Sequence, residues 1–411
     1  PLDIGQSRFH SSDRVLNDVW ELCRYTMLAT SFCGVFVDGN RERLPYEADA
    51  YINQLGVYCC AREFALARFS HEYLITHATW PTEWILYSIF MAWADYQYTG
   101  DIEALRRWYP DLKAKALEPL ARPDGLISTE PGRVPESVLD SIHLRGTLRD
   151  IVDWPPGERD SYELGAINTV PNAVRCQALR LLGQIAAALG RDAEAAAYRA
   201  QAARVRDALQ ALLMDPQTGL FFDSEGSRHQ SLHATAFSLA FGLVPEAHRA
   251  RAAVFLAAKG MACSVYAAQF LLEALYEAGA DDAALGLLVS RGERSWAHMI
   301  YDVGSTIALE AWDNRFKPNQ DWNHAWGAAP ANLIPRLLMG VRPLEPGFSR
   351  ILIAPQPGPL TEAELVHPTI RGPVKTVFHQ EPGRSFAIEI EIPANTCARV
   401  ELPALGGAGG E

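Results

Sequence analysis

Three features that would each define a class of protein are missing from this sequence of 411 residues. No apolar run approaches the roughly 18 to 20 residues that a membrane-spanning helix needs. The basic residues number 37 against 49 acidic ones, and the formal net charge of −12 would repel a nucleic-acid backbone. The seven cysteines show neither metal-ligand nor disulfide-framework spacing. We therefore expect a soluble protein without a membrane or nucleic-acid partner, with its cysteines buried in a reducing compartment.

The chain opens on Pro1 rather than on methionine, and no signal peptide is visible. We interpret the sequence as a fragment or an unusually compact protein, with its natural N-terminus unseen. The lack of a signal peptide favours the cytoplasm, but the location and the oligomeric state stay open. Hydrophobic residues at 48% and charged residues at 21% are typical of a chain that buries a sizeable core.

Helical periodicity fills the chain up to about residue 338. Leu181 and Ile185 lie on one apolar face that ends at Gly190, and Leu209 and Leu212 mark the face of the next helix. We expect both faces to be buried. Similar segments cover residues 12–30, 48–77, 83–99, 102–117, 230–243, 246–258, 265–278, 281–290 and 325–338. Short connections with Gly or Pro favour antiparallel neighbours, so this mainly α region (residues 1–340) is predicted to form a closed double ring of helices, a toroid.

The pattern changes after about Val341. Short runs that alternate apolar and polar residues are divided by Pro and Gly, as in "RSFAIEIEIPANTCARVELPA". This period of two predicts a small antiparallel β-domain over residues 341–411. Its last residues, "GGAGGE", have the composition of a flexible tail.

Carboxylates and aromatic rings crowd the stretch "VFVDGNRERLPYEADAY" at residues 35–51. Glu42, Tyr46 and Asp49 are spaced by four and three residues, so a helix would place them on one face. The segment connects the first two predicted helices, where a toroid presents loops at the mouth of its cavity. The alternative from periodicity alone is a solvated helix start, in which Arg41 and Arg43 neutralise their acidic neighbours.

A second group of acidic and aromatic residues lies far along the chain, in "DVGSTIALEAWDNRF" and "NQDWNHAWG". It contains Glu310, Trp312 and His324. Tryptophan also stands beside a carboxylate at two intermediate places, in the pairs Glu83 with Trp84 and Asp153 with Trp154. Pyranose rings stack on aromatic faces, sugar hydroxyls bind carboxylates and His, and glycosidic cleavage needs two carboxyl groups. These segments therefore indicate a sugar site, although any single tryptophan could equally be part of the core.

The segment "VDGNRERLPYEADAY" resembles the sugar-binding region of the bacterial α-L-rhamnosidase family of glycoside hydrolases, and "GSTIALEAWD" is similar to the segment that holds that family's second catalytic carboxylate. The likeness continues through "DWPPG", "NHAWG" and "GFSRILIAPQPG", in the family's order and over almost the whole chain. It implies an (α/α)6 barrel followed by a small β-sandwich, cleavage of terminal α-L-rhamnose with inversion at the anomeric carbon, and no organic cofactor.

The resemblance also assigns roles to individual residues. Glu42 would be the general acid that protonates the leaving oxygen, and Glu310 the base that activates water. The sugar would be bound by Asp38, Tyr46, Asp49, Trp154, Trp312 and His324. The pairing of tryptophan with a carboxylate adds Glu83, Trp84 and Asp153 as sugar-binding candidates. The loop "DGNRE" is shorter than the family's usual form and Tyr46 replaces its usual tryptophan, which loosens the assignment of Asp38 and bears on the sugar accepted.

Other readings remain open at this stage. Glu47 competes with Glu42 as the acid. The histidines show no metal-binding spacing, so no metal site is expected. The substrate would be a small-molecule or oligosaccharide glycoside, but another α/α-barrel glycosidase, a uronyl hydrolase or a catalytically silent carbohydrate-binding protein would share the scaffold and the aromatic residues.

Overall fold

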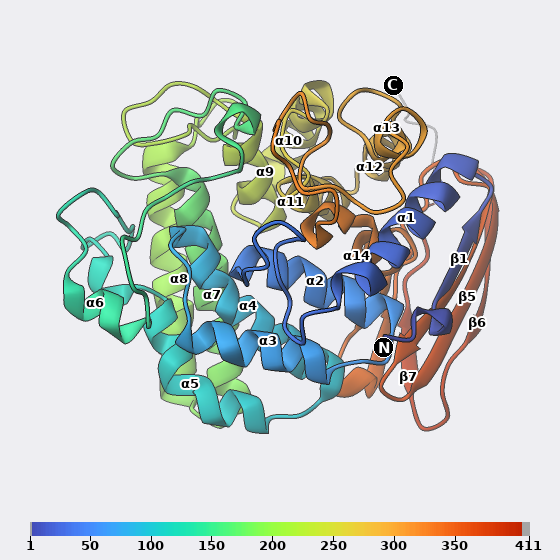
Figure 1. Cartoon of the computed structure of the whole chain (residues 1–411), viewed down its shortest axis with the longest axis horizontal. Helices are drawn as coiled ribbons and strands as arrows, with labels where there is room; N and C mark the ends of the chain where they lie inside the picture. The colour runs from blue at the N-terminus through green and yellow to red at the C-terminus, as the bar shows by residue number, and fades with distance from the viewer. Residues whose placement is uncertain (1, 405–411) are drawn as a thin grey trace.

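The computed structural model describes residues 2–404 of the chain. Helices fill most of the molecule, and two β-sheets lie along one edge (Figure 1). The glycine-rich C-terminal tail predicted from the sequence lies outside the described residues. Among the described residues, no helix has the length and apolar character needed to cross a membrane.

A ring of inner helices forms the centre of the helical region. Each inner helix contacts the next around the ring, and the last contacts the first, which closes it. The fold is therefore the six-hairpin helical toroid that the periodicity and the resemblance predicted. In the described chain, the inner elements are α2 (Glu47–Cys60), α4 (Thr82–Thr99), α7 (Thr169–Ala188), α9 (Leu232–Ala240), α11 (Ala268–Glu277), and α14 (Pro330–Leu333) with the π-helical turn η5 (Ile334–Leu338).

Outer helices pack around this ring with one face in water. The difference is visible in burial: every residue of α2 is buried, whereas α8 buries only residues spaced along one stripe, such as Val205 and Leu209. Leu212 is 46% exposed, so its predicted burial is wrong. The outer elements are α1 (Arg14–Thr30), α3 (Ala65–Thr76), α5 (Glu103–Lys115), α8 (Asp192–Leu213), α10 (Glu246–Lys259) and α12 (Asp281–Leu288).

Two short helices were missed by the periodicity, α6 (Glu136–Ser141) and α13 (Trp296–Tyr301), because fewer than two turns leave no repeating pattern. The segment predicted as one helix over residues 48–77 is two helices, since the backbone is extended at Ala61, the C-cap of α2. The segment predicted as one helix over residues 325–338 is the 3-10 helix η4 (Ala325–Ala328) followed by α14 and the π-helical turn η5. The other inner and outer helices start and end within a few residues of the predicted bounds.

Aromatic rings fill the axis of the toroid. Tyr87 stacks on Tyr51 and on Phe270, with ring centroids 5.4 and 5.7 Å apart. Its hydroxyl lies 2.7 Å from the hydroxyl of Tyr266, which satisfies two polar groups in an otherwise apolar core. Tyr266 in turn packs edge-on against Trp84. The axis is therefore a packed core, with a cavity at each end of it.

The C-terminal region forms two small sheets among the described residues. The larger is antiparallel throughout, in the order β1 (Arg8–Ser11), β4 (Glu362–Thr369), β5 (Gly372–Glu381) and β6 (Ser385–Glu391). The smaller pairs β2 (Val341–Pro343) with β3 (Arg350–Ile353) antiparallel, but β3 with β7 (Cys397–Val400) parallel.

Two details of this region differ from the sequence prediction. Strand β1 comes from the N-terminus and was not predicted, because four residues carry too little pattern; Figure 1 shows it, in blue, against the red C-terminal strands. The parallel pair in the smaller sheet departs from the expected all-antiparallel arrangement. The cysteine prediction also fails in part, since Cys33 and Cys397 are exposed while the other five are buried.

Candidate active site

A small pocket lies at the N-terminal ends of the inner helices. Its volume is about 200 Å³, below the roughly 300–1,000 Å³ of sites for drug-sized ligands, and is suited to one sugar residue. The side chains come from the starts of α2 and α4 and from the loops that precede α7 and α14. They are Asp38, Glu42, Tyr46, Asp49, Trp80, Trp84, Ile151, Trp154, Glu310, His324 and Trp326.

The pocket joins the two acidic segments that are far apart in the sequence. Gly39 pairs with His324 in an isolated antiparallel bridge, and the Arg41 backbone N–H donates to an Asp321 carboxylate oxygen at 2.7 Å. A Cβ atom at residue 39 would lie 2.5 Å from Asp321 Oδ2, so only glycine permits this close approach. Ring closure thus brings the loop before α2 against the loop before α14.

One guanidinium contacts both proposed catalytic carboxylates. Arg41 Nη1 lies 2.8 Å from Glu42 Oε1, and Arg41 Nη2 lies 3.6 Å from Glu310 Oε2. The Tyr46 hydroxyl donates to Glu42 Oε2 at 3.2 Å. Glu42 lies in a turn ahead of α2, and Tyr46 is the N-cap of that helix, so the predicted shared helix face is wrong. A hydrogen bond, rather than helical spacing, holds the two together.

The two carboxylates occupy different depths. Glu42 sits at the mouth, with its side chain 34% exposed, whereas the Glu310 side chain is 5% exposed. Behind Glu310, Lys317 Nζ lies 3.1 Å from Oε1, and the Asp321 backbone N–H donates to Oε2 at 2.7 Å. A buried carboxylate is stable only when paired or hydrogen-bonded, and Lys317 supplies the charge that compensates it. Sequence reasoning missed Lys317, because nothing in its neighbourhood marks it.

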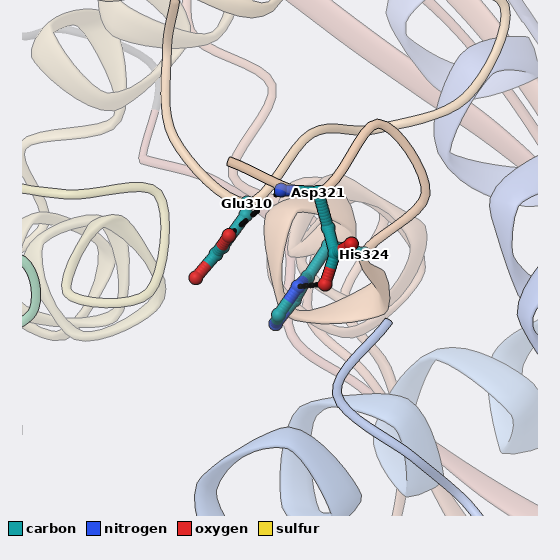
Figure 2. Close-up of side chains that lie close together, drawn as sticks. All are labelled: Glu310, Asp321 and His324. Carbon is teal, nitrogen blue, oxygen red and sulfur yellow. Dashed lines mark hydrogen bonds and ion pairs between the residues drawn. The ribbon is translucent and has the colours of Figure 1, made fainter. Parts of the chain in front are cut away.

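A buried ion pair stands beside Glu310. His324 Nε2 lies 2.7 Å from Asp49 Oδ1, and its Nδ1 lies 3.7 Å from Asp321 Oδ2; Figure 2 shows Glu310, Asp321 and His324 gathered from one loop. Burial opposes the charged imidazolium, but Asp49, Asp321 and Glu310 raise the pKa of His324 to about 9. Burial, followed by the charge of Asp49, raises the pKa of Asp38 to about 7.

Glu310, Asp321 and His324 also have the donor types of a metal site, with ligand atoms within 4.8 Å of one another. Two observations speak against that role. Lys317 and Arg41 already compensate the charge of Glu310, and His324 Nε2 is already paired with Asp49 Oδ1 at 2.7 Å. We assign the group to hydrogen bonding and charge compensation.

Aromatic rings form the walls of the pocket. Trp84 packs edge-on against Tyr46 and Trp326, with ring centroids 5.7 and 6.0 Å away, and Trp80 lies 6.4 Å from Trp84. Trp154 is half-buried on the loop before α7. The prediction assigned Trp84 and Trp154 to the site but not Trp80 or Trp326. Trp326 lies within the segment "NHAWG" quoted above, and Trp80 stands four residues before Trp84.

Three predicted sugar-binding residues, Trp312, Glu83 and Asp153, do not line the pocket. Trp312 is fully buried, packs edge-on against Trp296, and donates from Nε1 to the Cys263 carbonyl at 2.7 Å. Glu83 is buried and accepts the backbone N–H groups of Ile151 and Val152. The expectation that these side chains face the sugar is wrong for both, because each is used to fix the backbone or the core.

Asp153 and Glu47 are likewise turned away from the pocket. Asp153 lies 2.7 Å from His233 Nε2 and accepts the Ser264 backbone N–H at 2.9 Å, which anchors the loop that carries Trp154. Glu47, the alternative acid, is fully buried and accepts the backbone N–H of Thr79 at 3.1 Å. It therefore does not compete with Glu42 for a place in the pocket.

A pocket of carboxylates and aromatic rings at one end of a closed helical toroid defines the class of this protein: a six-hairpin helical fold with an acidic, aromatic pocket. Within that class, the chain belongs to the bacterial α-L-rhamnosidase family. The family model described as the bacterial alpha-L-rhamnosidase 6 hairpin glycosidase domain matches residues 5–338. The model of the family's C-terminal domain matches residues 340–411.

Individual relatives agree with this membership. An alpha-L-rhamnosidase of Streptomyces avermitilis is 26% identical over 331 residues, which are 77% of this chain and 29% of that protein. The GH78 family rhamnosidase of Bacillus sp. GL1 has the same fold with a TM-score of 0.81 at 22% identity, covering 98% of this chain and 43% of that one.

A second similar structure is the S. avermitilis alpha-L-rhamnosidase complexed with L-rhamnose. Its TM-score is 0.77 at 21% identity, over 98% of this chain and 39% of that one. At this identity the likeness of both structures concerns the fold. The chain spans about a third of the length of the curated relatives that it matches.

Proposed function

We propose that this chain is the catalytic part of a glycoside hydrolase that removes terminal α-L-rhamnose from glycosides with inversion. The observation that carries the proposal is the placement of Glu42 and Glu310 on opposite nitrogens of one Arg41 guanidinium, at the rim and the base of a sugar-sized pocket. Two carboxyl groups with a gap between them, about 6.5–9.5 Å in inverting glycosidases, leave room for an attacking water.

Glu42 acts as the general acid in this mechanism. It donates its proton to the glycosidic oxygen while the bond from that oxygen to the anomeric carbon breaks. Glu310 takes a proton from the water that attacks the opposite face of the same carbon, and the free sugar leaves with inverted configuration. The positions fit these duties, since the leaving group exits past the exposed Glu42 and the buried Glu310 lies on the inner side.

The rest of the pocket binds and orients the sugar. Asp38 and Asp49 accept hydroxyl hydrogen bonds, and the protonated His324 donates one. The walls formed by Trp84 and Trp154 offer aromatic faces to the apolar side of the ring, including the methyl group that distinguishes rhamnose from most hexoses. Arg41 contacts both catalytic carboxylates and fixes their positions before the substrate binds.

A panel of nitrophenyl glycosides tests the proposal. We expect turnover of the α-L-rhamnoside and little or none of the β-D-glucuronide, α-D-glucoside and α-L-arabinoside. Proton NMR during the reaction should show β-L-rhamnose as the first product. Preferred turnover of the glucuronide would assign a uronyl hydrolase instead, and binding of rhamnose without any turnover would leave a carbohydrate-binding protein.

A further inference from the structure

A second cavity lies at the opposite end of the toroid axis. Its volume is about 400 Å³, and its lining comes from the C-terminal halves of the inner helices together with the first strand of the β-domain, β2. The stacked rings of Tyr51, Tyr87 and Phe270 fill the axis between this cavity and the active-site pocket. The mechanism proposed above makes no use of it.

Two arginines enter this cavity, and they differ in their partners. Arg336 Nη1 lies 3.0 Å from Glu273 Oε1 and donates to Asn332 Oδ1 at 2.7 Å. Arg342, on β2, makes no side-chain hydrogen bond or ion pair with any described residue, and its Nε is buried without a partner. The other carboxylate of the lining, Glu277, lies 3.4 Å from Arg249.

Arg342 is partly buried, and its Nε is cut off from solvent without a hydrogen-bond partner. A cation that loses part of its hydration regains the loss through a counter-charge or hydrogen bonds. Burial, followed by the nearby charge of Arg336, lowers the pKa of Arg342. Arginine presents its donors in a planar fork that matches a carboxylate or another planar oxyanion, which makes Arg342 a ready anchor for such a group.

Three amide side chains line the same cavity as Arg342. Gln97 comes from α4, and Gln177 and Gln184 lie two turns apart on one face of α7. None of the three side chains hydrogen-bonds to another described residue, so their N–H₂ donors are available to a ligand. Several convergent donors around one free cation in a cavity of ligand size are the composition of an anion-binding site.

We infer that this cavity binds a carboxylate, held by the fork of Arg342 and by the amides of Gln97, Gln177 and Gln184. The carboxylate could be that of a sugar acid, whose hydroxyls would use the remaining amides, or that of a small free acid. A neutral sugar would leave Arg342 without its counter-charge. Because the site joins the inner helices to β2, its occupation would also stabilise the junction between the toroid and the β-domain.

Isothermal titration of the whole chain tests this inference without requiring turnover. The probes are D-glucuronate, acetate and D-glucose. We expect saturable binding of glucuronate with one site per chain, and no measurable binding of glucose. Acetate that binds as tightly as glucuronate would assign a small free acid as the ligand, whereas weaker acetate binding assigns a sugar acid. Equal affinity for glucose and glucuronate, or no binding of either acid, would overturn the inference.

Variants locate the binding. Arg342→Met should weaken glucuronate binding roughly 10- to 100-fold, because a charge-assisted bidentate contact is lost. Trp154→Ala, which changes the pocket at the other end, is the matched control and should bind glucuronate like the wild type. Binding that depends on Trp154 but not on Arg342 would place the acid in the active-site pocket and contradict the inference.

A second variant covers the outcome in which Arg342→Met does not fold, since Arg342 lies at a domain junction. Gln177→Leu removes an amide whose side chain has no described partner and should therefore melt like the wild type. We expect it to weaken glucuronate binding several-fold. Unchanged affinity in this variant, with an unchanged melting temperature, would contradict the assignment.

Discussion

The two ends of the inner helix ring differ in the charges that they carry: the first turns of α2 and α4 hold carboxylates, whereas two arginines and two glutamates line the cavity at the far end. Glu47 and Asp49 lie in the first turn of α2, and Glu83 in the first turn of α4, at the active-site end. Arg336 lies in the last turn of η5, at the other end, near Arg342. Helix N-termini stabilise negative groups and C-termini positive ones, and the inner helices run in one direction.

The ends also differ in how far their charges are compensated. At the active-site end, Glu42, Glu310 and Asp49 each contact a cationic side chain, supplied by Arg41, Lys317 and His324. At the far end, the described residues offer Arg342 no partner. Under the two proposals made above, the first arrangement is preorganised for a neutral sugar and the second is completed by an anion. Substitutions at defined places should make these differences measurable.

The largest expected effect follows from removing the buried carboxylate. Glu310→Gln should lower kcat for nitrophenyl α-L-rhamnoside by about 10²- to 10⁴-fold, because water must be activated whatever group leaves. The control is Glu389→Gln, an exposed carboxylate on β6, which should leave kcat unchanged. Near wild-type turnover by Glu310→Gln would refute its role as the base.

Substitution of Trp312, in the core, and of Trp154, in the pocket, should have opposite effects on stability and on substrate binding. Trp312→Ala should lower the free energy of unfolding by about 3–5 kcal/mol, because a fully buried ring and its hydrogen bond to Cys263 are lost. Trp154→Ala should change stability little and raise KM for the rhamnoside, roughly tenfold. Urea unfolding and steady-state kinetics on both variants provide the measurements. The reverse pattern would show that the two side chains have been assigned to the wrong environments.

Substitution of the exposed carboxylate should act selectively. Glu42→Gln should slow rhamnosides with alkyl leaving groups by roughly one to two orders of magnitude more than nitrophenyl rhamnosides, because only poor leaving groups need a donated proton. Tyr46→Phe removes the hydrogen bond to Glu42 but keeps the carboxyl, and should show little of this selectivity. Equal losses on both substrate types would argue against a general acid at this position. The effects of Glu42→Gln and Glu310→Gln should not add, since both groups act in one transition state.

The smallest effect concerns the pH dependence of stability. The folded protein holds the Asp38 proton more tightly than the unfolded chain, because the pKa rises from 3.8 to about 7. The free energy of unfolding should therefore fall as the pH rises through this window. Asp38→Asn should reduce that fall, as measured by urea unfolding of both proteins at several pH values. Identical pH profiles would show that Asp38 titrates normally.

Much of the helical region was predictable because its pattern is local. Helix α7 shows its buried face through Leu181 and Ile185, and Gly190 follows its end. Short elements such as α13 and β1 were not predictable, since their formation depends on packing against segments far away in the sequence. The burial of Leu212 was predicted wrongly, because an apolar residue next to a buried stripe can still face water.

For the site, the sequence determined the chemistry. The density of carboxylates and aromatic rings around Asp38 to Asp49, and again around Glu310 to Trp326, is the basis on which the sequence predicts a sugar site, because those side-chain types are what a pyranose and its cleavage require. Helical periodicity likewise determined that the chain forms a ring of helix pairs. Both properties reside in residue types and short spacings.

Only the tertiary structure decided which of these residues meet. Closure of the ring brings the loop of Glu42 against the loop of Glu310, and Arg41 and Lys317 gain their partners from that contact alone. It also turned Trp312 into the core and left Trp154 at the pocket. Loop residues have no periodicity that fixes their direction, so their orientation follows from long-range packing and buried hydrogen bonds, which no local stretch of sequence contains.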